Sequence, residues 1–411
     1  MKKIKVASMF MVAVIGTAAI VPVVSTESYA ADSAISVAEH TPQEIRQYID
    51  YHPLDTSYYD GFAVQPSTSY PYSAGRPDDK ALNNALNYLN CVRYIAGLQE
   101  VSLNSEYSNL AQHASLVDCV NGVLTHFPEQ PSDMPDDMYQ LGAKGAGSSN
   151  ICAGSSNLAR SVMLYMDDSD FSNIDRVGHR RWCLNPGMKE TGFGIVGRYS
   201  AMYAFDSKRT DATEKGVCWP AQNMPVEYFK PSVAWSVSTG EDLDYYNNIT
   251  VNVTRKSDSA EWNFSKTSSD GDFYIENNYY GQRGCIIFRP SDISISANDV
   301  YDVRIEGMEE PIEYTVNFFS LADVQDESGE NLIGDVNNDG FVDADDATAV
   351  LVEYSLLSTN QSGSFSKLQK KSADINSDGF TDADDATKIL EYYAYVSTNS
   401  DNISMKEWLL L

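Results

Sequence analysis

The sequence predicts a multidomain chain in which an α+β region is followed by an all-β sandwich and then by a small all-α unit. Three observations lead to this order. Apolar residues recur at helical spacing after residue 78, short alternating runs of strand-forming residues begin near residue 222, and one acidic motif occurs twice after residue 333. We therefore expect domains at residues 78–221, 222–322 and 333–396.

The N-terminus has the pattern of a secretory signal peptide. Three lysines among the first five residues precede an apolar run over residues 6–24, and the small residues Ser28, Ala30 and Ala31 suit cleavage after Ala30. An uncleaved N-terminal membrane helix is the alternative, but no stop-transfer segment follows and no later apolar run is long enough to span a bilayer. We expect a signal peptide at residues 1–30 and a secreted protein without a membrane span after its removal.

The chain is strongly acidic, with a formal net charge of -29 from 58 acidic and 29 basic side chains. A surface of this sign repels phosphate groups, so we expect neither nucleic acid nor an anionic membrane as a partner. A solvated acidic surface accounts for most of the excess, and the repeated motif near the C-terminus accounts for the rest.

Six cysteines stand far apart in the sequence, and no C-x-x-C pair of a zinc ribbon occurs. Export permits disulfides, and Cys91 and Cys119 lie on two successive predicted helices that could bring them together. Buried free thiols are an equal alternative in a protein made without oxygen. The six positions are Cys91, Cys119, Cys152, Cys183, Cys218 and Cys285.

Residues 78–221 begin with two predicted helices and end in predicted strands. The apolar helix faces are marked by Leu82, Leu86, Leu89 and Ala96 in the first helix and by Leu110, Ala114 and Val117 in the second. Asn104 or Ser105 supplies an N-cap between them. The later stretch ETGFGIVGRYSAMYAF has β-branched and aromatic residues between glycines, which predicts strands. One α+β domain accounts for this mixture.

Residues 222–322 contain short alternating runs, such as NITVNVTR and IEYTVNFFS, separated by Gly, Asn, Asp and Pro. Strands at this spacing without intervening helices predict a small immunoglobulin-like β-sandwich. The segments outside the domains are expected to be an extended lead-in at 31–77, a polar linker at 323–332 and a C-terminal tail at 397–411.

The stretch GDVNNDGFVDADDATAVL begins at Gly334, and most of it returns as ADINSDGFTDADDATKIL from Ala373. Each copy places oxygen-bearing side chains at loop positions 1, 3, 5, 9 and 12, a glycine at 6 and a backbone carbonyl at 7, which is the ligand spacing of a twelve-residue calcium loop. An acidic low-complexity turn explains one such copy but not two that match at every ligand position. We therefore expect two bound calcium ions. The predicted ligands are Asp335, Asn337, Asp339, Phe341, Asp343 and Asp346 for the first ion and Asp374, Asn376, Asp378, Phe380, Asp382 and Asp385 for the second.

A predicted helix follows each loop, and no full helix precedes either one. Two such half EF-hands near the end of a secreted chain resemble the type I dockerin family, over residues 333–396. The resemblance implies binding to a cohesin domain on a scaffolding protein, in a cellulosome-type assembly that degrades polysaccharides. It also implies that two residue pairs contact the cohesin and determine which cohesin is bound: Ala344 with Asp345, and Ala383 with Asp384. Because the two pairs are identical, docking in either of two orientations is expected, although the charged Asp departs from the hydroxyl pairs of some dockerins and leaves the cohesin unidentified.

Four segments of the α+β region resemble the bacterial CAP (SCP-like) domain: THF at 125–127, SSNICAGSSN at 148–157, VGHRRWCLNP at 177–186 and KETGFGI at 189–195. The resemblance implies an α-β-α sandwich with a cleft that holds two histidines and two acidic residues. His126 and His179 match the histidines. Glu190 fits one acidic segment and Asp168 lies near the other acidic position, whereas Ser149 stands in place of a family glutamate.

The cleft residues support more than one interpretation. A divalent metal is implied by the resemblance, but two imidazoles with loosely placed carboxylates make a weak site. Hydrogen bonding that ties helices to strands explains both histidines equally well. No G-x-S-x-G, H-E-x-x-H or phosphate-loop motif occurs, so no catalytic residue is assigned.

The sequence therefore favours a non-enzymatic secreted module, which a dockerin carries to a scaffold and whose CAP-like domain binds a cell-wall, plant-polymer or protein ligand. The first alternative is a hydrolase, acting on glycan or peptide, with its centre in the His126/His179 cleft. The second is a structural subunit whose only chemistry is docking. The missing glutamate at Ser149 favours the binding module over the hydrolase.

Overall fold

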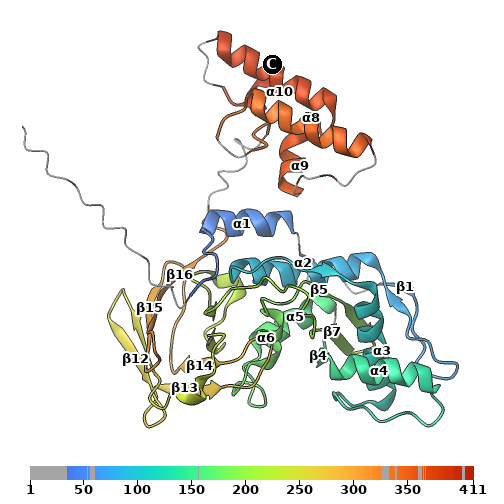
Figure 1. Ribbon diagram of the computed structural model, residues 1–411, viewed down its shortest axis with the longest axis vertical. Helices are drawn as coiled ribbons and strands as arrows, with labels where there is room; N and C mark the ends of the chain where they lie inside the picture. The colour runs from blue at the N-terminus through green and yellow to red at the C-terminus, as the bar shows by residue number, and fades with distance from the viewer. Residues whose placement is uncertain are drawn as a thin grey trace, which may run out of the picture. The chain divides into compact units, whose positions relative to one another are not determined.

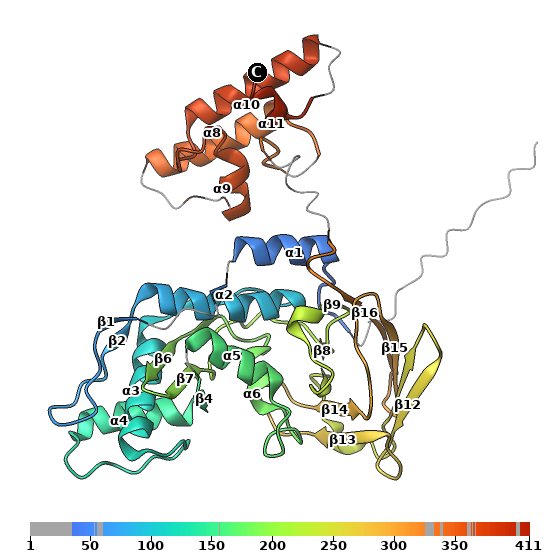
Figure 2. The same cartoon turned by 180° about the vertical axis from the view of Figure 1, so that it is seen from behind.

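The computed structural model describes residues 35–52, 54–55, 61–155, 157–324, 333–337, 340–359, 363, 365, 367–399 and 403–411. Figures 1 and 2 show these parts from two sides. The predicted signal peptide and the predicted calcium ligand Asp339 lie outside the described residues. Within the described part of the chain, no helix has the length and apolar character needed to cross a membrane.

The lead-in was expected to be extended, and this is wrong for its middle part. Helix α1, Pro42–Tyr51, begins with a capping box in which Thr41 and Glu44 each bind the other's backbone N–H. Ile45 of this helix is buried in the main hydrophobic core. The apolar residues Ile45, Tyr48 and Ile49 have helical spacing, and this short signal was missed within a segment rich in Tyr, Pro, Ser and Asp. The short strands β1, Phe62–Val64, and β2, Arg76–Pro77, follow and pair antiparallel.

The two helices predicted after residue 78 are present. They are α2, Asp79–Ile95, and α3, Ser105–Asn121. Asn104 caps α3 by accepting hydrogen bonds from the backbone N–H groups of Glu106 and Tyr107, which confirms the predicted start. The remaining elements of this region are β3 (Ser102–Leu103), α4 (Asp136–Gly147), β4 (Ser149–Ala153), α5 (Leu158–Asp167), α6 (Gly178–Cys183), β5 (Glu190–Thr191), β6 (Phe193–Val196) and β7 (Tyr199–Tyr203).

Helices cover both faces of a small antiparallel sheet of order β4-β7-β6. Alternate residues of β6 point to opposite faces: Phe193 and Ile195 join the core that contains α2 and α5, whereas Val196 packs with Leu116 of α3. A Cβ on Gly194 would lie 2.2 Å from the backbone nitrogen of Gln112, so only glycine lets α3 approach the sheet this closely. The layers are therefore α-β-α, as the CAP resemblance implied.

Two packed sheets form the next region. One has the order β13-β14-β10-β8 and the other β12-β11-β15-β16-β9, and all pairings are antiparallel except that of β16 with β9. Aromatic side chains join them: the ring centroids of Trp235 and Tyr301 are 5.6 Å apart, and those of Phe264 and Phe288 are 5.5 Å apart. The expected boundary at residue 222 falls after the first strand of this sandwich. The strands are β8 (Val217–Trp219), β9 (Asn223–Pro225), β10 (Trp235–Ser238), β11 (Thr250–Arg255), β12 (Ala260–Phe264), β13 (Gly271–Glu276), β14 (Cys285–Pro290), β15 (Val300–Glu306) and β16 (Ile312–Phe319).

The C-terminal region is helical and internally repeated. Its helices are α8 (Ala344–Ser358), α9 (Lys367–Ala373), α10 (Ala383–Thr398) and α11 (Met405–Trp408). Its core contains equivalent residues from the two copies: Val336 with Ile375, Ala347 with Ala386, and Val350 with Ile389. Helix α9 directly precedes the second loop, where no helix was expected, because its short and mostly polar sequence has no apolar stripe.

The predicted tail also proves to be structured over its described residues. Met405 of α11 is 2% exposed within the core of the C-terminal region. The ring of Trp408 packs on that of Tyr392 with centroids 5.8 Å apart, and the Tyr392 hydroxyl donates to the carbonyl of Ile403. These contacts hold the end of the chain against α10.

All six cysteines are free thiols, so Cys91 and Cys119 do not form a disulfide. Four of them, Cys91, Cys183, Cys218 and Cys285, are buried. Burial raises the pKa of each of these thiols, that of Cys91 to about 12. They pack as small apolar side chains.

We expect Met405→Ala to destabilise the C-terminal region by about 2–3 kcal/mol, because it removes a buried side chain and leaves a cavity. Calorimetry of the full chain with calcium present should show a lower melting temperature for that region alone. Leu410→Ala is the control, since Leu410 is 83% exposed and its truncation should change the unfolding free energy by less than about 0.5 kcal/mol. Equal effects of the two substitutions would contradict the packing of α11.

Candidate functional site

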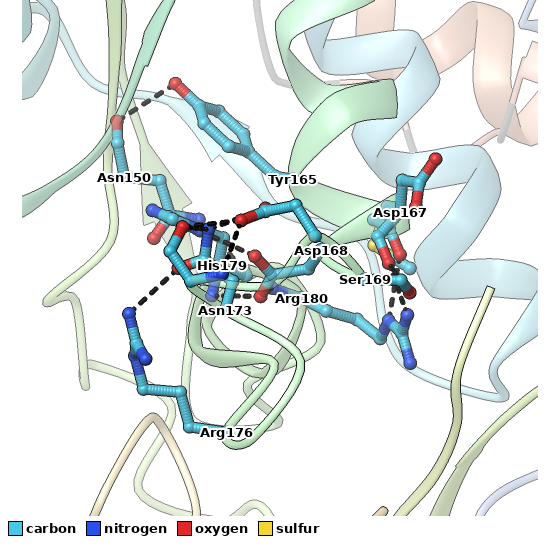
Figure 3. Close-up of polar contacts among 12 residues, drawn as sticks. Asn150, Tyr165, Asp167, Asp168, Ser169, Asn173, Arg176, His179 and Arg180 are labelled. Carbon is cyan, nitrogen blue, oxygen red and sulfur yellow. Dashed lines mark hydrogen bonds and ion pairs between the residues drawn. The ribbon is translucent and has the colours of Figure 1, made fainter. Parts of the chain in front are cut away.

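His179 is held by a buried carboxylate. The Asp168 side chain is 4% exposed, and its Oδ1 accepts a hydrogen bond from His179 Nδ1 at 2.8 Å. Its Oδ2 accepts from the backbone N–H groups of His179, at 2.9 Å, and Arg180, at 3.3 Å. Figure 3 shows these contacts at the start of α6. Because a carboxylate can only accept, His179 Nδ1 is the donor, and in the neutral imidazole Nε2 is an acceptor.

Neighbouring side chains brace the same imidazole. The Tyr165 ring stacks on that of His179 with centroids 5.5 Å apart. The Tyr165 hydroxyl donates to the carbonyl of Asn150, whose side-chain amide donates to the carbonyl of His179 (Figure 3). Strand β4 and helices α5 and α6 therefore fix one imidazole orientation.

His126 has a comparable arrangement with a different acceptor. Its Nδ1 lies 2.8 Å from the carbonyl oxygen of Ala146, near the end of α4, so Nδ1 is the donor. The preceding residue, Thr125, donates its backbone N–H to the carboxylate of Asp118 in α3. Burial raises the pKa of Asp118 to about 7. Helices α3 and α4 thus position this second imidazole.

Both histidines line one pocket of about 310 Å³, at the lower end of the range for ligand sites. Its polar lining includes Ser149, Asn150 and Arg176. Its aromatic lining consists of Phe127, Trp182, Phe205 and Tyr280. Tyr280 belongs to the segment between β13 and β14, so the β-sandwich supplies one wall of the pocket.

Glu190, expected beside the histidines, does not line this pocket. Parallel pairing of β5 with β3 places it next to the start of α3, where its Oε2 accepts a hydrogen bond from the Asn104 amide. A hydrogen bond from Lys208 lowers its pKa. The carboxylate is thereby engaged in a separate surface cluster, and Glu190 is removed from the candidate cleft.

The pocket residues do not fit a divalent metal. Among the described lining residues the metal-binding groups are two imidazoles, since Asp168 lies behind His179 and uses both oxygens for N–H donors. In the described residues as a whole, the repeated C-terminal loops included, no three His, Cys, Asp or Glu side chains are grouped as a metal site. A zinc site needs three or four protein ligands. The metal implied by the resemblance is therefore not supported in this cleft.

Two consecutive arginines tie α6 to the β-sandwich. Arg180 is fully buried, and its guanidinium donates to the carbonyls of Met166, Asp167 and Ala234. Burial lowers the pKa of Arg180 to about 10, so the side chain stays charged at neutral pH. Arg181 donates to two carbonyls of the segment after β13 and stacks on the ring of Tyr280. Sequence reasoning missed this role, although the VGHRRW run contains both side chains.

The repeated loops near the C-terminus fold alike. In the first, Asp346 accepts hydrogen bonds from the backbone N–H groups of Val336, Asn337 and Asp343. In the second, Asp385 accepts from the equivalent Ile375, Asn376 and Asp382. Both carboxylates are completely buried, and burial raises the pKa of each. Each also forms a capping box with the N-cap residue directly before the next helix, Asp343 or Asp382.

The residues of these loops fit calcium. The described donors are carboxylate, amide and carbonyl oxygens, which a hard cation prefers. Gly340 and Gly379, at position 6, have φ of 88° and 87°, the left-handed conformation that a sharp turn requires. The position-12 carboxyl groups, Asp346 and Asp385, are buried and are held beside the loop by three backbone N–H groups each, and a cation in the loop would favour their charged form.

Comparison with known families gives two matches. Residues 86–205 match the model of the Cysteine-rich secretory protein family, CAP, and residues 333–392 match that of the Dockerin type I domain. No curated protein matches the chain. His126, Asp168 and His179 lie within the first match, and both repeated loops lie within the second.

We expect Arg180→Met to lower the free energy of unfolding of the region before residue 325 by about 3 kcal/mol or more. The substitution leaves several buried carbonyl groups without a donor, and each such loss costs about 1–3 kcal/mol. Urea unfolding measures the change. Arg283→Met removes an exposed pair with Asp242 and should cost less than about 1 kcal/mol. Similar costs for the two variants would contradict the structural role of Arg180.

Proposed function

Because residues 86–205 form a CAP domain and residues 333–392 form a type I dockerin domain, we propose that the protein is a secreted component of a cellulosome-type assembly. Its dockerin binds a cohesin domain on a scaffolding protein when calcium is present. Its CAP domain presents the His126/His179 pocket to an extracellular ligand, such as a cell-wall, plant-polymer or protein ligand, in the context of polysaccharide degradation.

The observation that carries the docking proposal is a duplicated apolar surface. Leu351 and Tyr354 on α8 are 43% and 41% exposed, and the equivalent Leu390 and Tyr393 on α10 are 43% and 42% exposed. Large apolar side chains exposed on one module indicate a partner surface. Because the two surfaces carry the same side chains at the same positions, one cohesin surface can be met by either helix.

The two residue pairs proposed to contact the cohesin lie at the start of these helices. Ala344 and Asp345 begin α8, Ala383 and Asp384 begin α10, and all four are exposed. The carboxylates of Asp345 and Asp384 are thus available to a donor on the cohesin. A partner with a basic or amide-rich rim suits them.

Two calcium ions would be held by the predicted loop ligands, with the second set, Asp374 to Asp385, fully described. The ions supply positive charge that lets several carboxylates approach one another. In the protein itself, Asp343 and Asp382 link each loop to its helix by capping it. Order in the loop and in the docking helix is therefore coupled.

A hydrolase is the second candidate function, favoured by the Asp168–His179 pair and its acceptor Nε2. Ser149 brings a hydroxyl to the same pocket. The Ser149 Oγ makes no hydrogen bond to His179 or to any other described residue, whereas an activated nucleophile and its base lie within hydrogen-bonding reach. We therefore favour binding over hydrolysis. Intact ligand after long incubation would support this choice, and product release would support the hydrolase.

We expect calcium chelation to unfold residues 333–411 and to leave the preceding domains folded. A cation that binds only the folded loops adds its binding free energy to stability. Calorimetry of the full chain should lose one transition in chelator, and Asp335→Ala combined with Asp374→Ala should have the same effect. Asp384→Ala, an exposed residue outside the proposed ligand set, should retain the transition. An unchanged profile in chelator would refute the calcium proposal.

We expect Leu351→Asp and Leu390→Asp each to weaken cohesin binding by only about twofold, because removing one of two equivalent orientations costs about 0.4 kcal/mol. The double variant should lose binding by a factor of about 100 or more, as a charge then enters both apolar surfaces. Titration calorimetry against a panel of cohesins measures this. A single variant that abolishes binding would show that only one orientation is used.

A further inference from the structure

The pocket lining has a charge that contrasts with that of the chain. The protein carries 58 acidic side chains, yet none lies among the described residues that line the pocket. The charged lining residue is Arg176. Its guanidinium has five N–H donors, of which one at Nη1 forms an ion pair with Asp175 and one at Nη2 donates to Asn173. The remaining donors suit an anionic group of a ligand, and a carboxylate matches this fork.

The other polar groups of the pocket need a ligand that also donates hydrogen bonds. His126 and His179 both use Nδ1–H for an acceptor outside the pocket, which leaves Nε2 of each as an acceptor. Ser149 Oγ is buried in the lining and has no hydrogen-bond partner among the described residues. Because this oxygen has almost no surface open to solvent, a ligand in the pocket does not reach it. A simple carboxylate has no donor, whereas a hydroxylated acid has both kinds of group.

Aromatic rings form the remaining wall. Phe127 is 87% exposed and Phe205 is 49% exposed, although both are large apolar side chains. Trp182 packs beside Phe205 with ring centroids 4.6 Å apart, and Tyr280 closes the wall from the β-sandwich. Exposed rings at the edge of a pocket offer flat apolar faces, which suit the C–H face of a sugar ring.

From these three features we propose that the pocket binds an acidic saccharide, a sugar that carries a carboxylate. The carboxylate lies against Arg176, hydroxyl groups donate to the two imidazoles, and the ring packs on the aromatic wall. Tyr280 is a specificity-determining residue supplied by the β-sandwich. This inference rests on the proposed function of the CAP domain as a ligand-binding module and names its ligand class.

Titration calorimetry of the full chain at fixed calcium concentration tests the proposal. The probes are trigalacturonate, a glucuronate-containing disaccharide, the methyl ester of trigalacturonate, and triglutamate as an acidic peptide. We expect binding of at least one acidic saccharide. For trigalacturonate, loss of the charge in the ester should weaken binding at least tenfold. Arg176→Met and Tyr280→Ala should each weaken saccharide binding by a similar factor.

Matched controls separate these effects from general damage. Arg283→Met removes another arginine that is paired with a carboxylate, and Tyr245→Ala removes an aromatic ring that is 81% exposed, both outside the pocket lining. Both should bind as the unmodified protein does. Tyr280→Phe retains the ring and should keep most of the affinity if stacking is what Tyr280 provides, and thermal melting shows whether each variant is folded.

Several outcomes would overturn the proposal. These are equal binding of the ester, tighter binding of triglutamate, no binding of either acidic saccharide, and unchanged affinity in Arg176→Met. If the ester or the peptide binds in the pocket, ligand binding by the CAP domain stands and only the ligand class is wrong. If no probe binds while cohesin binding persists, the acidic saccharide is excluded and docking remains. Loss of cohesin binding with saccharide binding retained would instead refute only the docking proposal.

Discussion

A buried guanidinium joins segments of the chain that are far apart in sequence. Arg180 donates to carbonyl groups at the end of α5 and to Ala234, which directly precedes β10. A cation without water must keep all its acceptors, because each one lost leaves a desolvated polar group. Helix α6 therefore cannot shift without the end of α5 and the first sheet of the sandwich. His179 directly precedes Arg180, so its position is fixed by the same contacts. The backbone N–H groups of both residues donate to Asp168.

The contact between α6 and the β-sandwich makes the sandwich part of the pocket. A Cβ on Gly178 would lie 3.1 Å from the Tyr280 ring, so the start of α6 and the sandwich are in close contact beside the pocket. Arg181, three residues after Gly178, stacks its guanidinium on the same Tyr280 ring. A CAP domain cut at residue 205 would lack this wall, and its pocket would open to solvent. The sandwich is thus part of the pocket wall as well as a spacer before the dockerin.

Local patterns in the sequence predicted the elements with strong periodicity or strong end signals. The starts of α2 and α3 are examples, and so are the strands after residue 190, since caps, apolar spacing and glycine-bounded β-branched runs act over a few residues. The prediction was wrong at α1, which is stabilised by a capping box and by contact with a distant core.

In the site, the repeated loops could be predicted because every proposed ligand of one loop lies within twelve residues. Tyr280 and Arg176 could not be found in this way, because nothing near them in sequence shows that they meet His126. Glu190 was misplaced for the same reason: strand pairing, which spans nearly ninety residues from β3 to β5, decides where its side chain lies.

The state of the cysteines has a consequence for how this protein is made and kept. A chain with six thiols and no disulfide has no such bonds that must be formed in the correct order. Thiol exchange proceeds through the thiolate, and burial disfavours the thiolate at Cys91, Cys183, Cys218 and Cys285. The folded protein therefore resists oxidation at these four positions. Its lifetime depends on remaining folded, because unfolding that exposes the core would also expose these sulfur atoms to oxidation.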